Sequence, residues 1–250
     1  MAGVVQNNTT SYGATNTGSI CFGNLSKAAG YESFVGGGYN NAANMYRSAI
    51  VGGHNNTVGS NWGCILGGEG NTINASSNYS TIIGGEYNEA GQQYTTAFGA
   101  RAKTSVFGQI AYASGYFAST GDAQGSTYIL RAATTDATST VLTTTLSSAG
   151  STNQIVAASD TAITFDGVII GMQSGAQAYG SWRVEGLLLN DGGTTTLVNS
   201  AITVISNNSS WGLALAADNT NNALSITVTG EANHNIRWCA NLRTVQVTYS

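Results

Sequence analysis

The chain has 250 residues and a formal net charge of −4, and only 8% of its residues are charged, against about 25% in an average globular protein. Its eight lysines and arginines are too few for a nucleic-acid surface or an anionic membrane surface, so we expect no nucleic-acid partner. A hydrophobic content of 42% is ample for a packed core and argues against intrinsic disorder.

The first segment, residues 1–18, is polar and unrepeated. It lacks the basic stretch followed by an apolar run that marks a secretory signal peptide, so we expect none. The three cysteines, Cys21, Cys64 and Cys239, lie far apart in the chain. Such spacing predicts neither a disulfide framework nor a metal site, and no cofactor motif is found.

Residues 19–118 carry a glycine-rich repeat. Its four clearest copies are "ESFVGGGYNNA" (32–42), "SAIVGGHNNTV" (48–58), "GCILGGEGNTI" (63–73) and "STIIGGEYNEA" (80–90). An apolar pair precedes the first glycine of each copy, and an asparagine follows at a fixed distance. The repeat glycines and the repeat asparagines are Gly36, Gly52, Gly67 and Gly84, and Asn40, Asn56, Asn71 and Asn88.

A period of about 15 residues is too short for a helical hairpin or a propeller blade, but it fits one turn of a β-solenoid. Stacked rungs would place the apolar pair in the interior and the glycines at a tight corner, where only glycine adopts a positive φ cheaply. The asparagines could then stack in a hydrogen-bonded ladder. An aromatic column, Tyr31, Tyr46, Trp62, Tyr79 and Tyr94, precedes the apolar pairs.

The repeat allows two chemical interpretations. A phosphate-binding loop is rejected because the motif recurs and lacks both a terminal Lys-Ser/Thr pair and a following helix. Glu69 and Glu86 would lie on adjacent rungs with their Cα atoms about 5 Å apart, a spacing compatible with the carboxylate pair of a retaining glycosidase. The alternative is a solvated turn column that happens to carry two acids.

The repeat rhythm ends in a short linker, residues 119–125. Residues 126–250 then alternate apolar and polar residues in short runs such as "SWRVEGLLL" (181–189) and "ALSITVTG" (223–230), with a hairpin signal at Asp191-Gly192. We therefore predict an all-β protein: a parallel β-roll, or β-solenoid, followed by an antiparallel, jelly-roll-like β-sandwich.

Two resemblances rest on these motifs. Units such as "SAIVGGHNN" and "STIIGGEYN" resemble the head repeats of trimeric autotransporter adhesins, which are parallel β-rolls assembled as trimers. The second half, with "WRVEGLLLNDGGTTTLV" and "ADNTNNALSITVTGEA", is similar to the distal domains of bacteriophage tail fibres. The missing signal peptide favours the phage fibre over the autotransporter.

The resemblance implies a homotrimeric tail or capsid fibre of a virion, made in the host cytoplasm. Residues 1–18 would attach it to other virion proteins, and residues 126–250 would bind a host surface polysaccharide or outer-membrane protein. We expect such an adhesive protein to have no enzymatic activity. The alternatives are a virion-associated polysaccharide depolymerase and a purely structural spike.

Receptor recognition is expected in the loops of the second half, where polar groups accompany an aromatic platform. The candidate receptor-binding residues are Tyr179, Trp211, Asn221 and His234. Each has an ordinary structural alternative: Tyr179 and Trp211 could pack in the core, and Asn221 could shape a turn. His234 has no second ligand at metal spacing. The aromatic column is the candidate intersubunit face of the trimer.

Overall fold

The computed structural model describes residues 13–175, 178–207 and 209–249 and contains strands but no helix in these ranges. The chain divides into two compact units, residues 1–124 (unit 1) and residues 125–250 (unit 2). Residues 1–12 of the expected virion-attachment segment, residues 1–18, lie outside the described residues. Within the rest of that segment, Gly13–Ala14 form the first strand of unit 1.

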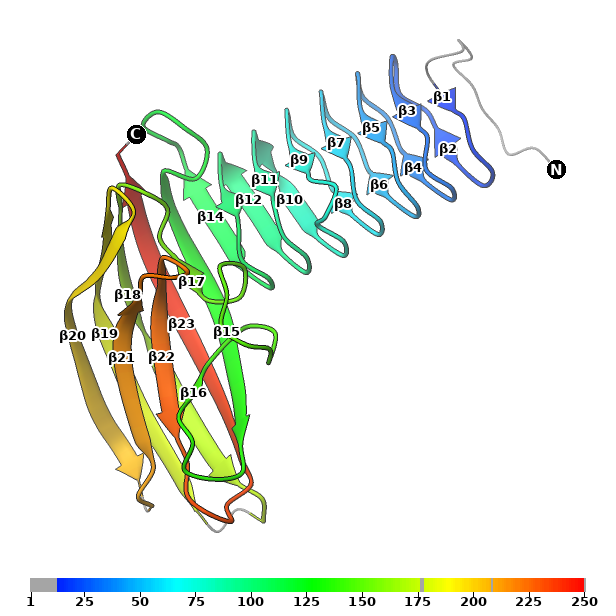
Figure 1. Ribbon diagram of the computed structural model, residues 1–250. Helices are drawn as coiled ribbons and strands as arrows, with labels where there is room; N and C mark the ends of the chain where they lie inside the picture. The colour runs from blue at the N-terminus through cyan, green and yellow to red at the C-terminus, as the bar shows by residue number, and fades with distance from the viewer. Residues whose placement is uncertain (1–12, 176–177, 208, 250) are drawn as a thin grey trace. The chain divides into compact units, whose positions relative to one another are not determined.

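Unit 1 is a parallel β-solenoid of about seven rungs, as the repeat predicts (Figure 1). Odd-numbered and even-numbered strands form separate parallel sheets, so each rung contributes one strand to each sheet. The first sheet contains β1 (Gly13–Ala14), β3 (Lys27–Ala28), β5 (Ala42–Ala43), β7 (Thr57–Val58), β9 (Thr72–Ile73), β11 (Glu89–Ala90) and β13 (Lys103–Thr104). The second contains β2 (Ile20–Cys21), β4 (Phe34–Val35), β6 (Ala49–Ile50), β8 (Cys64–Ile65), β10 (Thr81–Glu86), β12 (Thr96–Ala100) and β14 (Ile110–Ser114).

The strand register corrects the assignment of the first repeat glycine. Val35 pairs with Ile50, so Gly37 and not Gly36 occupies the position of Gly52. The slip arises because "GGG" at residues 36–38 offers two alignments to the next copy of the motif. The parallel pairing of β4 with β6 admits only one of them.

One apolar residue of each pair fills the interior, and the other faces outward. The inward column, Val35, Ile50, Ile65 and Ile82, is fully buried. The outward column begins at Gly36 and continues with Val51, Leu66 and Ile83, which are 51%, 48% and 50% exposed. The expectation that both residues of each pair are internal is therefore wrong, because successive side chains of a strand point to opposite faces.

A ladder of buried asparagines runs through the glycine corner. Asn71 is typical: its Nδ2 donates to Gly67 O at 3.1 Å and to Gly85 O at 2.9 Å. Its Oδ1 accepts from the backbone and side-chain nitrogens of Asn88, at 2.9 and 3.0 Å. The same pattern joins Asn41, Asn56, Asn71 and Asn88.

Asn40 is not part of this ladder, contrary to the sequence assignment. It is exposed, has a φ of 53°, and its Nδ2 donates to Asn55 Oδ1 at 2.7 Å. Its neighbour Asn41 is buried and takes the ladder position. The same one-residue slip explains this error, because two adjacent asparagines fit the motif equally well.

Unit 2 contains two sets of paired strands, one of long strands and one of shorter strands. One sheet has the order β15-β23-β18-β19-β20, with β15 at Ala123–Thr134, β18 at Thr161–Gln173, β19 at Tyr179–Asp191, β20 at Thr194–Asn207 and β23 at Ile236–Thr248. In the other, β22 (Ala223–Thr229) pairs antiparallel with β16 (Thr140–Val141), β17 (Ile155–Val156) and β21 (Gly212–Asp218). The hairpin expected at Asp191-Gly192 is present between β19 and β20.

Three tryptophans meet in the core of unit 2. Trp238 of β23 lies 5.8 Å from Trp182 of β19 and 5.2 Å from Trp211, which precedes β21, measured between ring centroids. All three side chains are buried, and Trp238 Nε1 donates to Thr134 Oγ1 at 3.0 Å. The two sheets therefore touch through these rings, while the complete jelly-roll-like sandwich stays a prediction.

Replacing Asn71 by alanine should strongly destabilise unit 1. The change leaves Gly67 O and the Asn88 N–H without their Asn71 partner in a buried place, at about 1–3 kcal/mol for each unsatisfied group. Gly85 O and Asn56 Oδ1 each lose one bond but keep the backbone N–H groups of Glu69 and Asn71. Calorimetric melting should show a clearly lower Tm for Asn71→Ala. Asn40→Gly, which keeps the φ of 53° accessible, is the control and should melt close to the wild type, and equal Tm losses for both variants would contradict the ladder assignment.

Candidate functional site

The glycine corner forms one long edge of the solenoid, which we call the glycine edge: residues 23–26, 37–41, 52–56, 67–71, 84–88 and 99–102. Here the rungs approach so closely that a Cβ on Gly53 would lie 2.2 Å from Gly68 O. Gly53 also has a φ of +100°, which L side chains rarely adopt. The corner backbone is thereby fixed, and the residues just after each glycine pair project into solvent.

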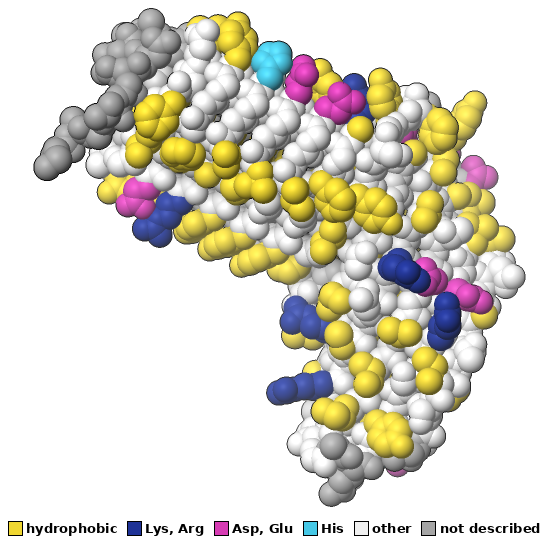
Figure 2. Space-filling model, turned by 180° about the vertical axis from the view of Figure 1, so that it is seen from behind, with side chains coloured by type: hydrophobic (Ala, Val, Ile, Leu, Met, Phe, Trp, Pro, Cys, Tyr) yellow, Lys and Arg dark blue, Asp and Glu magenta, His cyan; other side chains and the backbone are white. Residues whose placement is uncertain are grey.

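A column of polar and aromatic side chains follows the glycine pairs. Tyr39, His54, Glu69 and Glu86 succeed one another on neighbouring rungs through parallel bridges. His54 Nδ1 lies 3.3 Å from Glu69 Oε1, and the ring centroids of Tyr39 and His54 are 5.5 Å apart. Figure 2 shows a histidine beside acidic side chains along one edge of unit 1.

Glu69 and Glu86 are therefore adjacent, as the repeat predicts, and both are exposed. Parallel strands lie about 4.8 Å apart, so two carboxylates can act on the same bound group. The register also adds Tyr39 to this column. The repeat alone did not identify Tyr39. Counting from Gly36 puts Gly38 at this position of the column, whereas the observed register counts from Gly37 and puts Tyr39 there.

The opposite edge carries a ladder of aromatic rings, which we call the aromatic edge: Tyr31, Tyr46, Trp62, Tyr79, Tyr94 and Phe107. Successive ring centroids are 4.6–5.8 Å apart. Tyr46 and Trp62 meet at 89° because they occupy neighbouring corner positions rather than equivalent ones, with a positive φ at Trp62 but not at Tyr46. The first five rings are those expected from the sequence, and Phe107 extends the row.

Three of the four candidate receptor residues lie towards the same end of unit 2. The rings of Trp211 and His234 are 6.3 Å apart, and Ser174, in the β18–β19 hairpin that ends at Tyr179, donates its N–H to Asn235 O at 2.9 Å. Trp211 is only 4% exposed, whereas Tyr179 is 47% exposed. Trp211 therefore contributes to the core and offers little surface to a receptor.

Asn221 lies elsewhere, in the turn between β21 and β22. Its Nδ2 donates to Asp218 Oδ2 at 2.8 Å, which is the turn-shaping role considered as its alternative. Trp211 and His234 flank the other ends of these strands, which pair Gly212 with Thr229 and Asp218 with Ala223. A strand of the length of β21 spans about 20 Å, so one small ligand cannot contact both groups.

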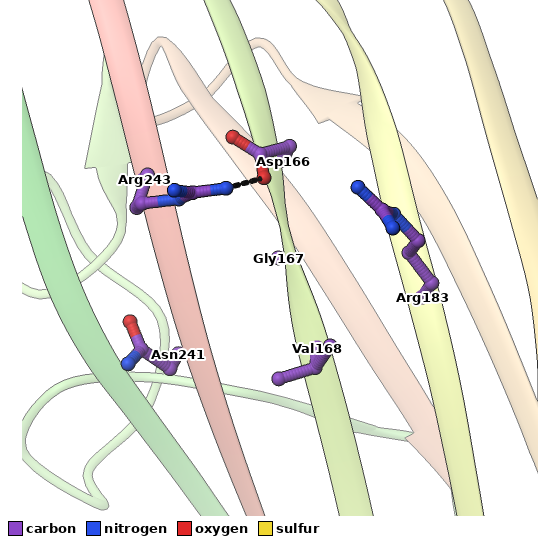
Figure 3. Close-up of a pocket in the computed structure, with 6 residues that line it drawn as sticks. All are labelled: Asp166, Gly167, Val168, Arg183, Asn241 and Arg243. Atoms are coloured by element: carbon purple, nitrogen blue, oxygen red, sulfur yellow. Dashed lines mark hydrogen bonds and ion pairs between the residues drawn. The ribbon is translucent and has the colours of Figure 1, made fainter.

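Two hollows indent unit 2. One, of about 460 Å³, lies at the end that carries Tyr179 and His234, and its lining includes Met172, Ser174 and Arg237. The other, of about 380 Å³, lies on the sheet face among Asp166, Gly167, Val168, Arg183, Asn241 and Arg243 (Figure 3). Arg243 is paired there with Asp166.

In the described part of the chain, no group of three histidine, cysteine or acidic residues is arranged to hold a metal ion. The same residues contain no helix of the length and apolarity needed to cross a membrane.

No protein-family model and no curated protein sequence matches the chain. The chain is similar to several solved structures of phage tailspikes. The tailspike of Acinetobacter baumannii bacteriophage Fri1, described as a capsular polysaccharide depolymerase, is 9% identical, with a TM-score of 0.32 over 86% of this chain and 47% of that one. The tailspike of Acinetobacter baumannii phage AM24 is 8% identical, with a TM-score of 0.26 over 95% and 49% of the two chains.

The tailspike of Acinetobacter phage vB_ApiP_P1 is 11% identical, with a TM-score of 0.24 over 87% of this chain and 51% of that one. The chain thus spans about half the length of the solved structures it matches. These distant similarities also correct one expectation. We expected a protein without enzymatic activity, and the depolymerase among the matched structures overturns that expectation. The function proposed below rests on the geometry of the site.

Replacing Trp211 by alanine should destabilise unit 2 by about 3–5 kcal/mol, because it removes a buried indole that packs on Trp238. Urea unfolding followed by tryptophan fluorescence measures the loss. Tyr179→Ala, at an exposed position, should cost much less. Wild-type stability of Trp211→Ala would show that this indole is available to a ligand after all.

Proposed function

We propose that the chain is the polysaccharide-binding part of a phage tail protein, and that it cleaves the host surface polymer it binds at the glycine edge of unit 1. The observation that carries this proposal is the pair Glu69 and Glu86 on successive rungs, with His54 against Glu69. The similarity of the second half to phage tail fibres supports a location in the virion, with residues 1–18 attached to other virion proteins.

The glycine edge has the properties that a polysaccharide needs. Its columns repeat from rung to rung, so a polymer can lie along several rungs at once. The half-exposed rings of Tyr39, two rungs before Glu69 in the same column, and of Tyr87, directly after Glu86, offer apolar faces with a polar tip. Hydrogen bonds between rungs hold the backbone beneath these side chains, so that little ordering is needed on binding.

The chemistry proposed is glycoside hydrolysis. Paired carboxyl groups can divide the work: one protonates the leaving oxygen, and the other attacks the sugar or activates water. The neighbouring imidazole of His54 can orient Glu69 by a hydrogen bond. The choice between nucleophilic and water-mediated attack depends on the distance between the two carboxyl groups in the complex.

The second proposal concerns assembly as a homotrimer. The half-exposed column Val51, Leu66 and Ile83 and the aromatic edge form continuous apolar rows along unit 1, visible as hydrophobic side chains in Figure 2. Apolar rows of this length are uncommon on the surface of a monomer. We assign them to contacts between copies of the chain.

A second host contact is proposed at the end of unit 2 that carries Tyr179 and His234, where the larger hollow lies. An outer-membrane protein or a sugar could be bound there by adaptable polar groups beside the exposed tyrosine ring. This contact would serve adhesion and would not require Glu69 or Glu86.

Glu69→Gln and Glu86→Gln should each lower the release of oligosaccharides from host polysaccharide by about 100-fold or more, because each removes a group that transfers a proton or attacks the sugar. Reducing-end assays on capsular and lipopolysaccharide preparations measure the release, and co-sedimentation measures binding, which should persist. Glu32→Gln, on the aromatic edge, is the matched control. Undiminished release from both variants, or no release by the wild type, would contradict hydrolysis at this edge.

Leu66→Glu should weaken self-association without unfolding unit 1. The position is exposed in the single chain, so the new carboxylate is solvated there, whereas a trimer would bury its charge. Light scattering should give a trimer for the wild type and smaller species for the variant. Thr72→Glu, on the other sheet, controls for added charge. A monomeric wild type would end this proposal.

A further inference from the structure

Arg101 occupies an unusual place on the glycine edge. It follows β12, one rung after Glu86, and its N–H donates to Glu86 O at 2.9 Å. Its guanidinium carbon lies 4.7 Å from the ring centroid of Tyr87 and 4.0 Å from that of Tyr116. Two aromatic faces therefore hold the cation in one orientation.

The guanidinium of Arg101 has no acceptor in the described part of the chain. Its Nε is buried and makes no hydrogen bond, and the group forms no ion pair there. Arg47 provides the comparison: it lies 4.7 Å from the Tyr46 ring, yet its Nε donates to Glu32 Oε2 at 2.6 Å. The buried Nε is closed to an outside ligand, but the terminal Nη groups are not among the buried unpaired atoms. A charged donor without a protein acceptor gains from one supplied from outside, so a ligand that meets these Nη groups would stabilise Arg101.

The loop that carries Tyr116 is fixed by Asp122. The carboxylate of Asp122 accepts hydrogen bonds from the backbone N–H groups of Phe117, Ala118 and Ser119, the last two at 2.6 and 2.7 Å. Burial raises the pKa of Asp122, but these hydrogen bonds outweigh it and hold the pKa below its usual range. Gly121 N–H also donates to Arg101 O at 2.8 Å, which joins the loop to the site.

A carboxylate fits this arrangement best. A guanidinium with a fixed plane binds a planar carboxylate through two parallel hydrogen bonds. The half-exposed rings of Tyr87 and Tyr116 flank the cation and offer surfaces on which a sugar ring can pack. A phosphate ester carries more negative charge and would be repelled more strongly by Glu86 and Glu69.

We propose that Arg101, Tyr87 and Tyr116 form a subsite for a carboxylate-bearing sugar, a uronic acid, within the polysaccharide bound at the glycine edge. This inference rests on the proposed function of that edge. It adds a substrate class: an acidic polymer whose carboxylate is held one rung away from the Glu86 side chain. Arg101 acts in binding and orientation, and the proton transfers stay with the glutamates.

The test compares purified full-length variants for binding to immobilised polymers: polygalacturonate, neutral dextran and dextran sulfate. The wild type should prefer polygalacturonate, and Arg101→Gln should bind it at least tenfold more weakly, with unchanged binding to dextran. Arg101→Lys should recover only part of the affinity because it lacks the planar fork. Arg47→Gln, which removes an arginine with the same ring contact but its own carboxylate partner, should bind like the wild type.

Each other outcome has a defined meaning. Equal binding of polygalacturonate by Arg101→Gln and the wild type overturns the subsite. Equal and Arg101-dependent binding of dextran sulfate shows general attraction of anions and overturns the carboxylate assignment. Binding of dextran without a preference for polygalacturonate overturns the subsite but leaves the proposed function intact. Binding of none of the three polymers also overturns the subsite, and the release assay on host polysaccharide then decides the proposed function separately. Tyr116→Ala, which leaves the charge in place, tests the same subsite should Arg101→Gln melt early.

Discussion

The hydrogen bonding between successive rungs is the interaction on which the rest of unit 1 depends. Very short strands make few ladder bonds of their own, so the corners must also be satisfied. Buried asparagines do this at the glycine edge, where each side chain bonds the carbonyls of its own rung and of the next. The ladder requires rungs close enough that a Cβ on Gly68 would lie 2.0 Å from Gly85 O. The asparagine ladder thus depends on glycine at this corner, because only glycine lets the rungs approach closely enough for each asparagine to bond two of them.

The sequence predicted the architecture of unit 1 well because a solenoid converts a linear period into stacked columns. It predicted the register of the first rung poorly, because "GGG" and the Asn40–Asn41 pair each allow two alignments of equal quality. Backbone bridges between Tyr39 and His54 decide between them. The motif itself matches both alignments equally well. The two alignments differ only by one residue in the spacing between β4 and β6, which the motif does not specify.

Trp211 shows a different limit. A tryptophan after the polar loop "SNNSS" has the composition of an exposed platform. Its burial depends on Trp238, which enters the same core from β23, the last strand of the chain. Arg101 was missed for a similar reason: Tyr116 reaches it only because Asp122 folds residues 117–119 around its carboxylate. Contacts of this kind follow from tertiary packing and leave no periodic trace in the sequence.

The columns themselves distinguish structural from functional positions. Where stacking alone sets the requirement, the same residue type recurs on neighbouring rungs, as in Asn56, Asn71 and Asn88 or in the aromatic edge. The column Tyr39, His54, Glu69 and Glu86 has the same backbone geometry but changes its chemistry at almost every rung. Stacking does not require that variation, because exposed side chains on fixed corners are free to differ. A ligand that extends across several rungs would require it, since each rung then meets a different part of the polymer.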